Sequence, residues 1–264
     1  MAYENLLYEL EEGIATITVN RPRVFNALNR ASVLEMEEAF LDARADEEVR
    51  VVILTGAGKK AFIAGADVTE INEIVKGGAL EGRDALPMRG RPLINLVMGL
   101  GKPVIAAVNG YCLGAGCELL YACTLGYAAE GAQFGQPEVN LGFNPCWGGT
   151  QQLTRLAGAR KALEHLLLGE MFDASEALRL GIVNQVVAAE ELMPTVRAVA
   201  SALAAKSPLA LKVIIECVRQ AGDLTLEQGL DLEANSFGLL CGTEDIVEGT
   251  EAFLEKRKAE FRGK

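Results

Sequence analysis

One apolar stretch, residues 102–123, limits most strongly what this chain can fold into. It reads KPVIAAVNGYCLGAGCELLYAC. The run 102–110 predicts a buried strand, and the glycines at 114 and 116 predict that a helix begins there. The wider apolar region, about 103–128, is interrupted by Asn109 and Glu118. It therefore predicts a core segment of a folded domain rather than a membrane span.

Further strands and helices are expected on both sides of this stretch. Alternating β-branched residues predict a strand over 13–20, and the apolar run 49–56 predicts a buried one. Residues 31–44 carry apolar side chains at helical spacing and predict an amphipathic helix. Residues 76–92, rich in Gly and Arg, are expected to form a loop before a helix that ends near residue 100.

The last quarter of the chain has helix signals only. Ser207 followed by Pro208 is typical of a helix start, and further helices are expected over about 225–240 and 243–258. We therefore expect two parts, a β/α core over residues 1–195 and an all-helical region over 196–264.

Composition narrows the classes of partner and compartment. The chain has 25 basic and 36 acidic residues, a net charge of −11, which disfavours nucleic acid and anionic membranes as partners. The exception is the basic end of the chain, 255–264. Six cysteines without a C-x-x-C pair and a single histidine predict no zinc site and reduced thiols. The acidic start lacks a signal-peptide core, so we expect a cytoplasmic protein.

Two turns between a strand and a helix are built from small residues. They are AGADV (64–68) and LGAGCEL (113–119). Backbone N–H groups at such turns can bind an anion or a polarised oxygen, so the N–H groups of Ala66 and Ala115 are candidates for an oxyanion hole. Asp67 is expected to cap the helix that follows the first turn. Taken singly, small residues at a turn between a strand and a helix are more often ordinary turn chemistry.

Two glutamates lie where carboxylates are unexpected. Glu118 lies one turn after Ala115 in an otherwise apolar helix, and Glu138 lies in GQPEVNLGF. Burial would raise the pKa of either carboxyl and make it a useful proton donor or acceptor. The alternative is a structural ion pair.

Longer motifs carry a resemblance to a known family. They are NRPRVFNALN, KAFIAGADVTEI, KPVIAAVNGYCLGAGCELLYAC, FGQPEVNLGF, GGTQQLTRLAG, FDASEALRLGIVNQVV and EGTEAFLEKRKAEF. Together they resemble the crotonase (enoyl-CoA hydratase/isomerase) family over nearly the full length, with the hydratases as the nearest members. The resemblance implies an α/β fold, a spiral of ββα units, with a C-terminal all-helical region that builds trimers, usually paired into hexamers.

The resemblance also implies a ligand, an acyl-CoA thioester, and no metal or redox cofactor. The thioester carbonyl would be held by the N–H groups of Ala66 and Ala115, although the family usually has Gly at the second position. The acyl-CoA contacts that it implies are Arg23, Val24, Ala64, Gly65, Asp67, Cys146 and Trp147, with Phe253 and Lys256 reaching the CoA of a neighbouring subunit.

Both glutamates of the family's hydratases are present. By this resemblance Glu118 would deprotonate the water that attacks the β-carbon, and Glu138 would deliver a proton to the α-carbon. The implied activity is that of an enoyl-CoA hydratase, a hydro-lyase. The alternatives within the family are an isomerase, a cyclic dienoyl-CoA hydratase or an acyl-CoA hydrolase. The alternative from another class is a non-catalytic binding or scaffold protein with the same fold.

The chain departs from the family at PCWGG (145–149), where hydratases usually have PGAGG or PGFGG. Cys146 and Trp147, the only Trp of the chain, are therefore unusual. Three hypotheses follow: neutral drift, an acyl pocket reshaped for a ring or a branched chain, or a nucleophilic Cys146. The third has little support because the single histidine, His165, lies in a helix expected to have only a packing role.

Overall fold

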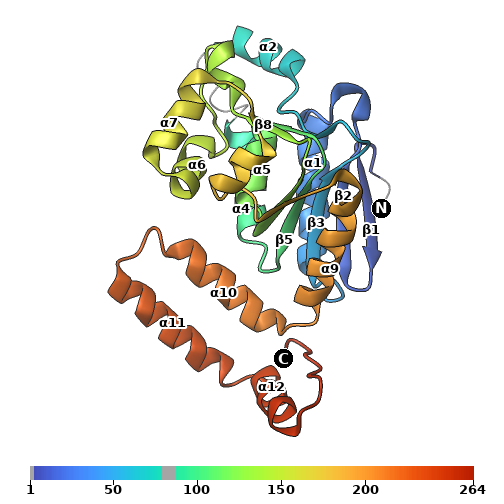
Figure 1. Cartoon of the computed structure of the whole chain (residues 1–264), viewed down its shortest axis with the longest axis vertical. Helices are drawn as coiled ribbons and strands as arrows, with labels where there is room; N and C mark the ends of the chain where they lie inside the picture. The colour runs from blue at the N-terminus through green and yellow to red at the C-terminus, as the bar shows by residue number, and fades with distance from the viewer. Residues whose placement is uncertain (1–2, 79–86) are drawn as a thin grey trace.

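The structure is a computed structural model, and it describes residues 3–78 and 87–264 of the chain. A layered α/β body contains two sheets, and a helical arm at the C-terminus extends away from it (Figure 1).

The larger sheet has six strands in the order β1-β2-β3-β5-β7-β10. Only β1 and β2 pair antiparallel, and the other neighbours are parallel, with Val52 of β3 opposite Val104 of β5. Every residue of β3 and β5 is buried, as expected for a parallel sheet with both faces covered. The strands are β1 (Leu6–Glu11), β2 (Ile14–Val19), β3 (Val51–Gly56), β5 (Val104–Val108), β7 (Leu125–Ala129) and β10 (Gln185–Val187).

From β3 to β8, strands of the smaller sheet alternate along the chain with strands of the larger one. Its strands are β4 (Ala61–Ile63), β6 (Tyr111–Leu113), β8 (Gln133–Gly135) and β9 (Phe172–Asp173), in that order. Strands β3, β5 and β7 of the large sheet are each followed by a short strand of the small sheet and then by a helical segment. These segments are α2 (Val68–Lys76), α5 (Ala115–Ala122) and the 3-10 helix η2 (Pro137–Leu141). The result is the expected spiral of ββα units, and it brings the starts of these helical segments to one edge of the small sheet.

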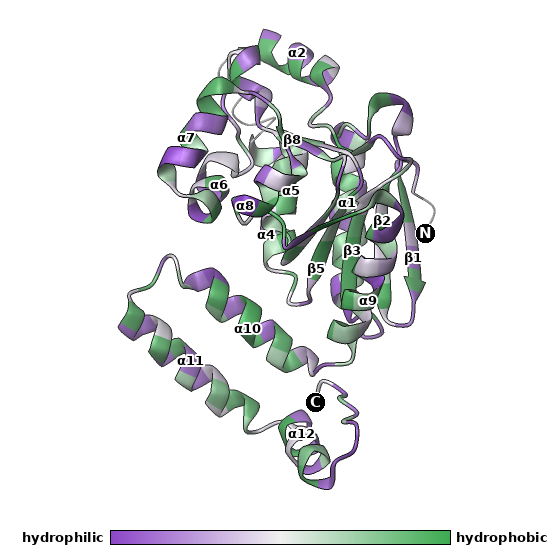
Figure 2. Cartoon of the chain, in the orientation of Figure 1, coloured by the Kyte–Doolittle hydropathy of each residue, from purple (hydrophilic) through white to green (hydrophobic). Residues whose placement is uncertain are grey.

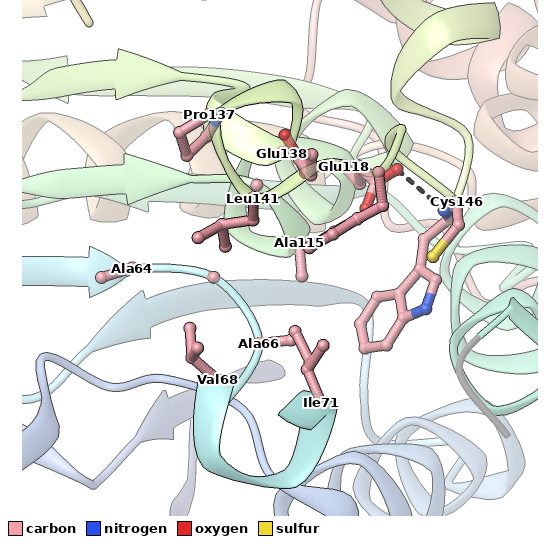
Figure 3. Close-up of a pocket in the computed structure, with 14 residues that line it drawn as sticks. Ala64, Ala66, Val68, Ile71, Ala115, Glu118, Pro137, Glu138, Leu141 and Cys146 are labelled. Atoms are coloured by element: carbon pink, nitrogen blue, oxygen red, sulfur yellow. Dashed lines mark hydrogen bonds between the residues drawn. The ribbon is translucent and has the colours of Figure 1, made fainter. Parts of the chain in front are cut away.

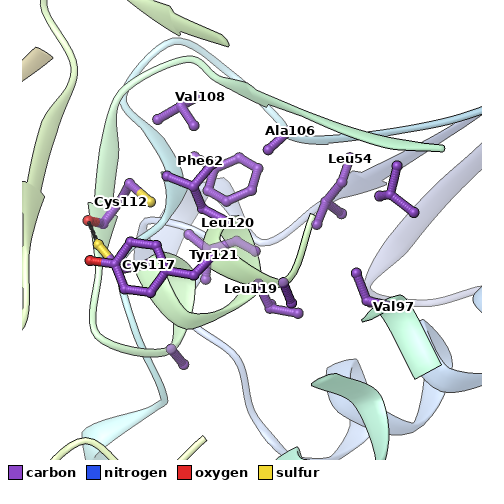
Figure 4. Close-up of a cluster of buried hydrophobic side chains, with 14 of the residues drawn as sticks. Leu54, Phe62, Val97, Ala106, Val108, Cys112, Cys117, Leu119, Leu120 and Tyr121 are labelled. Carbon is purple, nitrogen blue, oxygen red and sulfur yellow. Dashed lines mark hydrogen bonds between the residues drawn. The ribbon is translucent and has the colours of Figure 1, made fainter. Parts of the chain in front are cut away.

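Helix α5 is the element that holds the first glutamate inside the molecule. All of its residues are buried. Leu119 and Leu120 lie among the side chains of Leu54, Phe62 and Val108 (Figure 4). This packing fixes the orientation of α5, and with it the position of Glu118.

The remaining helices cover the two sheets or connect them. They are η1 (Pro22–Val24), α1 (Arg30–Ala45), α4 (Pro87–Met98), α6 (Gly149–Ala157), α7 (Ala159–Leu168), α8 (Ala174–Arg179), η3 (Ala189–Glu191) and α9 (Leu192–Ala204). The predicted end of the loop over residues 76–92 is wrong, because helix α4 already begins at Pro87. Residues 79–86 of the predicted loop lie outside the described residues.

The C-terminal arm consists of three helices, α10 (Pro208–Gln220), α11 (Leu226–Leu240) and α12 (Glu244–Glu255). Helices α10 and α11 form a hairpin in which no residue is buried, although both carry apolar side chains (Figure 2). The expected boundary between residues 195 and 196 falls inside α9, whose Leu192, Val196 and Ala200 pack on the large sheet. The change from body to arm comes after Ala204, where α9 and α10 meet at a bend of 108°.

Among the described residues, no single helix has the length and apolar character of a membrane span. The bent pair 189–204 and 208–220 meets these criteria by length and composition only.

Candidate active site

A cavity opens at the edge of the small sheet where α2, α5 and η2 begin (Figure 3). Ala64, Ala66, Val68 and Ile71 lie on one side of the cavity in this view. Ala115, Pro137, Leu141 and the two glutamates lie on the other side. The lining residues are Ala64, Gly65, Ala66, Val68, Ile71, Gly114, Ala115, Glu118, Pro137, Glu138, Leu141, Phe143, Cys146 and Trp147.

The N–H groups of Ala66 and Ala115 are both left without a partner among the described residues. Leu28 lies opposite Ala66: its N–H donates to the carbonyl oxygen of Gly65, and its carbonyl oxygen accepts from the N–H of Asp67. The N–H of Ala66 takes part in neither hydrogen bond. Ala115 is the first residue of α5, so its N–H has no acceptor within the helix. A Cβ at Gly116 would lie 2.1 Å from the carbonyl oxygen of Ile63, so this glycine lets α5 approach β4 closely. The two turns are thereby brought to the same cavity.

Glu118 is 2% exposed and is held by two backbone donors. The N–H groups of Trp147 and Gly149 both donate to its Oε1, each at 2.8 Å. Burial raises the pKa of the Glu118 carboxyl to about 7, and the two N–H groups partly oppose that rise. The carboxyl therefore titrates closer to neutral pH than an ordinary glutamate does.

Glu138 reaches the cavity from η2 and is 7% exposed. Burial raises the pKa of its carboxyl to about 7, and the charge of Glu118 adds to that rise. With its amide nitrogen turned toward the carboxylate, Gln136 donates to both oxygens of Glu138, at 2.9 and 3.1 Å. A Cβ at Gly114 would lie 3.0 Å from Oε1 of Glu138, so this carboxyl lies directly against the second glycine turn.

Cys146 and Trp147 complete the wall beside Glu118. Burial raises the pKa of the Cys146 thiol to about 12, and the charges of Glu118 and Glu138 act in the same direction. The thiol is therefore protonated at neutral pH, which argues against a nucleophilic Cys146. The Trp147 side chain is 6% exposed and lines the cavity.

Two other sequence candidates lie outside the cavity. Asp67 caps α2 by accepting a hydrogen bond from the N–H of Thr69 and pairs with Arg21 at 3.3 Å. It has the expected capping geometry but does not line the cavity. His165 packs on the ring of Phe172, with ring centroids 4.3 Å apart, in agreement with the expected packing role.

The expected CoA contacts lie in two places. Arg23 and Val24 form η1, and the next residue, Phe25, accepts a hydrogen bond from the N–H of Ala64 beside the cavity. Phe253, 82% exposed, and Lys256 belong to the end of α12. This helix lies at the opposite end of the molecule from α2 (Figure 1), so the structure does not bring these two residues to the cavity of their own chain.

Five apolar residues of the cavity wall were not predicted from the sequence, namely Val68, Ile71, Pro137, Leu141 and Phe143. Val68 and Ile71 are three residues apart directly after the first glycine turn. Their helical spacing next to a candidate oxyanion donor was a signal that could have identified them. Among the described residues, no group of three or more His, Cys, Asp or Glu side chains could hold a metal ion.

Two buried carboxyls with raised pKa values share the cavity with two backbone N–H groups that have no partner among the described residues. Such a set of groups is suited to acid–base catalysis beside a polarised carbonyl oxygen. Comparison with known proteins agrees with this chemistry. The chain belongs to the enoyl-CoA hydratase/isomerase family, whose model matches residues 9–264.

Individual relatives match over all or nearly all of their length. The chain is 42% identical to the crotonyl-CoA hydratase of Syntrophomonas wolfei over 264 residues, which is 100% of both chains. It is 40% identical to the short-chain-enoyl-CoA hydratase of Clostridium acetobutylicum over 98% of both chains. The crystal structure of an enoyl-CoA hydratase from Bacillus anthracis superposes with a TM-score of 0.93 at 35% identity, covering 99% of this chain and 100% of that one.

Proposed function

We propose that this protein is an enoyl-CoA hydratase, which adds water reversibly across the α,β double bond of an acyl-CoA thioester. The observation that carries the proposal is the pair of buried carboxyls, Glu118 and Glu138, each with its pKa raised to about 7. Such a pair can hold one carboxylate and one carboxylic acid at the same time near neutral pH. Hydration needs both forms.

Each step is assigned to a group of the cavity. The thioester oxygen accepts hydrogen bonds from the N–H groups of Ala66 and Ala115, which stabilise the enolate-like intermediate by about 3–4 kcal/mol per donor. Glu118 takes a proton from water as the water oxygen bonds to the β-carbon. Glu138 then gives its proton to the α-carbon. Proton transfer by positioned carboxyls contributes roughly a hundred- to ten-thousand-fold to the rate.

The proposal includes the rest of the ligand and the assembly. Arg23, Val24, Ala64 and Gly65 border the CoA moiety, while Asp67 acts on it only by fixing the start of α2. Phe253 and Lys256 contact the CoA bound to a neighbouring subunit of a trimer, or of a hexamer of two trimers. The exposed apolar side chains of the arm support self-association.

The proposed reaction draws only on carboxyls and backbone donors, so we assign no metal or redox cofactor to it. Nucleic acid and membranes are not among the proposed partners, because the net charge of −11 opposes both. All six cysteines are unpaired, which supports a reducing compartment, and we propose the cytoplasm.

Turnover of crotonyl-CoA tests the function, followed by loss of the enoyl-thioester absorbance and by the mass of the product. We expect a product that has gained one water and kept its CoA. Glu118→Gln and Glu138→Gln should each lower kcat by about a hundred-fold or more, whereas Glu130→Gln, in an exposed turn after β7, should not change it. Full turnover by both cavity variants would refute the mechanism. A product of unchanged mass would indicate an isomerase, and release of free CoA would indicate a hydrolase.

A further inference from the structure

Trp147 separates the catalytic cavity from other hollow regions of the molecule. It lines the catalytic cavity, a groove beside α2, and a larger second cavity between α4, α6 and α10. The second cavity has an apolar part formed by Ile94, Met98, Ile214 and Val218. Cys146 is the other residue that lines both the catalytic and the second cavity. Residues 146–147 are therefore the partition between the two.

The indole of Trp147 is seated directly on the backbone of α4. A Cβ built on Gly90 would lie 1.8 Å from Cε2 and 1.9 Å from Cδ2 of the indole, distances that no real contact allows. Glycine inside a helix costs about 1 kcal/mol relative to alanine, and Gly90 is not among the residues with positive φ. The space taken by the indole is therefore the physical reason for glycine at this position.

The partition is also tied to the catalytic carboxyl. The backbone N–H of Trp147 donates to Oε1 of Glu118 at 2.8 Å, so the position of the indole and that of the carboxylate depend on the same short segment. The segment cannot move away from the cavity without breaking this hydrogen bond. The wall that Trp147 forms is therefore held in place on both sides, by Gly90 and by Glu118.

The geometry limits the length of an acyl chain. In the proposed reaction the β-carbon lies beside the water held by Glu118, and the chain continues from that carbon. Glu118 is bonded to the backbone of Trp147, so the next carbons of the chain meet the partition.

We propose that Trp147, seated against Gly90, restricts the enzyme to short, unbranched enoyl thioesters of about four carbons. The proposal rests on the proposed hydratase function and names the substrate class of that site. It favours a short linear chain over the ring or branched chain considered from the sequence. The second cavity is space that a longer chain could enter only after the indole is removed.

Hydration rates for two chain lengths test the proposal. We expect kcat/KM of the native enzyme for crotonyl-CoA to exceed that for trans-2-decenoyl-CoA by about 100-fold, since misfitting methylenes in a pocket cost 10-fold or more. Trp147→Ala should reduce this ratio at least ten-fold, and Trp147→Phe should reduce it less. Met98→Ala, which enlarges only the second cavity, should leave the ratio unchanged while Trp147 is present.

Gly90→Ala provides a variant that leaves Trp147 itself intact. The added methyl must displace the indole, so the tryptophan emission of the unliganded protein should shift. Because Trp147 is the only Trp of the chain, that emission reports on this wall alone. An unchanged emission in folded Gly90→Ala would contradict the packing on which the proposal depends.

Binding of saturated thioesters gives a readout that needs no turnover. Butyryl-CoA should change the Trp147 emission, free CoA should not, and decanoyl-CoA should bind at least ten-fold more weakly than butyryl-CoA. If these three binding results were obtained with a protein that lacks hydratase activity, the proposed function would be refuted, but the proposed limit on acyl-chain length would still hold. The limit is overturned if decanoyl-CoA binds as tightly as butyryl-CoA, or if folded Trp147→Ala retains the native C4-to-C10 ratio.

Discussion

Glu118 and Glu138 differ from ordinary surface carboxyls because the fold keeps both away from water. Each has its pKa raised from 4.5 to about 7, mainly by burial. The proposed reaction needs Glu118 ionised and Glu138 protonated, so activity is lost when the pair takes up a second proton or releases its last one. We expect kcat/KM for crotonyl-CoA to be bell-shaped in pH, with a narrow maximum near neutrality. A rate that is constant from pH 5 to pH 9 would contradict this assignment.

The same shifts predict how stability depends on pH. Between about pH 4.5 and pH 7 the folded chain holds these protons more tightly than the unfolded chain does. The free energy of unfolding should therefore decrease as pH rises through this window. Glu118→Gln removes one of the two titrating groups and keeps an oxygen that can accept the N–H groups of Trp147 and Gly149. Urea denaturation at pH 5 and pH 8 should show a smaller decrease for this variant.

The catalytic candidates could be predicted from the sequence because each lies close to a local signal. Ala66 and Ala115 lie next to glycines, and Glu118 interrupts an apolar helix. The pairing of Trp147 with Gly90 could not be predicted in this way. The two residues are far apart in the sequence, and no local pattern predicts that the indole of Trp147 occupies the space where a side chain at position 90 would lie.

At the scale of elements, helices were easier to predict than strands. The caps at Asp67, Asp173 and Ser207 use side-chain signals that act within a few residues. Strands β1, β7 and β10 of the larger sheet were not predicted. β1 (LLYELE) contains charged residues, β7 (LGYAA) has no β-branched residue, and β10 has only three residues. Their neighbours in the sheet, rather than local sequence, determine these strands.

Helix α12 contains a buried carboxylate that holds the end of the chain in place. Asp245 accepts hydrogen bonds from the hydroxyl of Ser207 at 2.7 Å and from the N–H groups of Arg262 and Gly263 at 2.7 and 3.1 Å. Asp245→Ala would leave these donors unpaired, at a cost of about 2–3 kcal/mol. We expect faster hydrogen exchange and proteolysis over residues 256–264 in this variant.

Asp223→Ala is the matched control for this prediction. Asp223 forms an exposed ion pair with Arg155, and such pairs contribute about 0–1 kcal/mol. The control should therefore leave exchange in the C-terminal segment unchanged. Equal protection of residues 256–264 in native protein and Asp245→Ala would show that other contacts hold this segment.

The whole molecule presents an apolar surface that a single chain does not cover. Helices α10 and α11 have no buried residue. Four large apolar side chains of α11 are 55–80% exposed, namely Leu226, Leu230, Phe237 and Leu239. Helices of this length gain most of their stability from packing an apolar face, so the hairpin needs a surface to dock against. In the proposed trimer, that surface is supplied by neighbouring copies of the chain.

Charge placed on this surface tests the assembly and the site together. Phe237→Glu should convert the trimer into monomers in light scattering, because a buried unpaired carboxylate is unfavourable at an apolar interface. The control Leu34→Glu, on the exposed face of α1, should remain trimeric. The monomer should also bind acyl-CoA more weakly, since Phe253 and Lys256 of a neighbouring subunit would no longer reach the CoA. A monomeric Phe237→Glu with native affinity for butyryl-CoA would show that each site is complete within one chain, whereas a trimeric variant would place the subunit interface elsewhere.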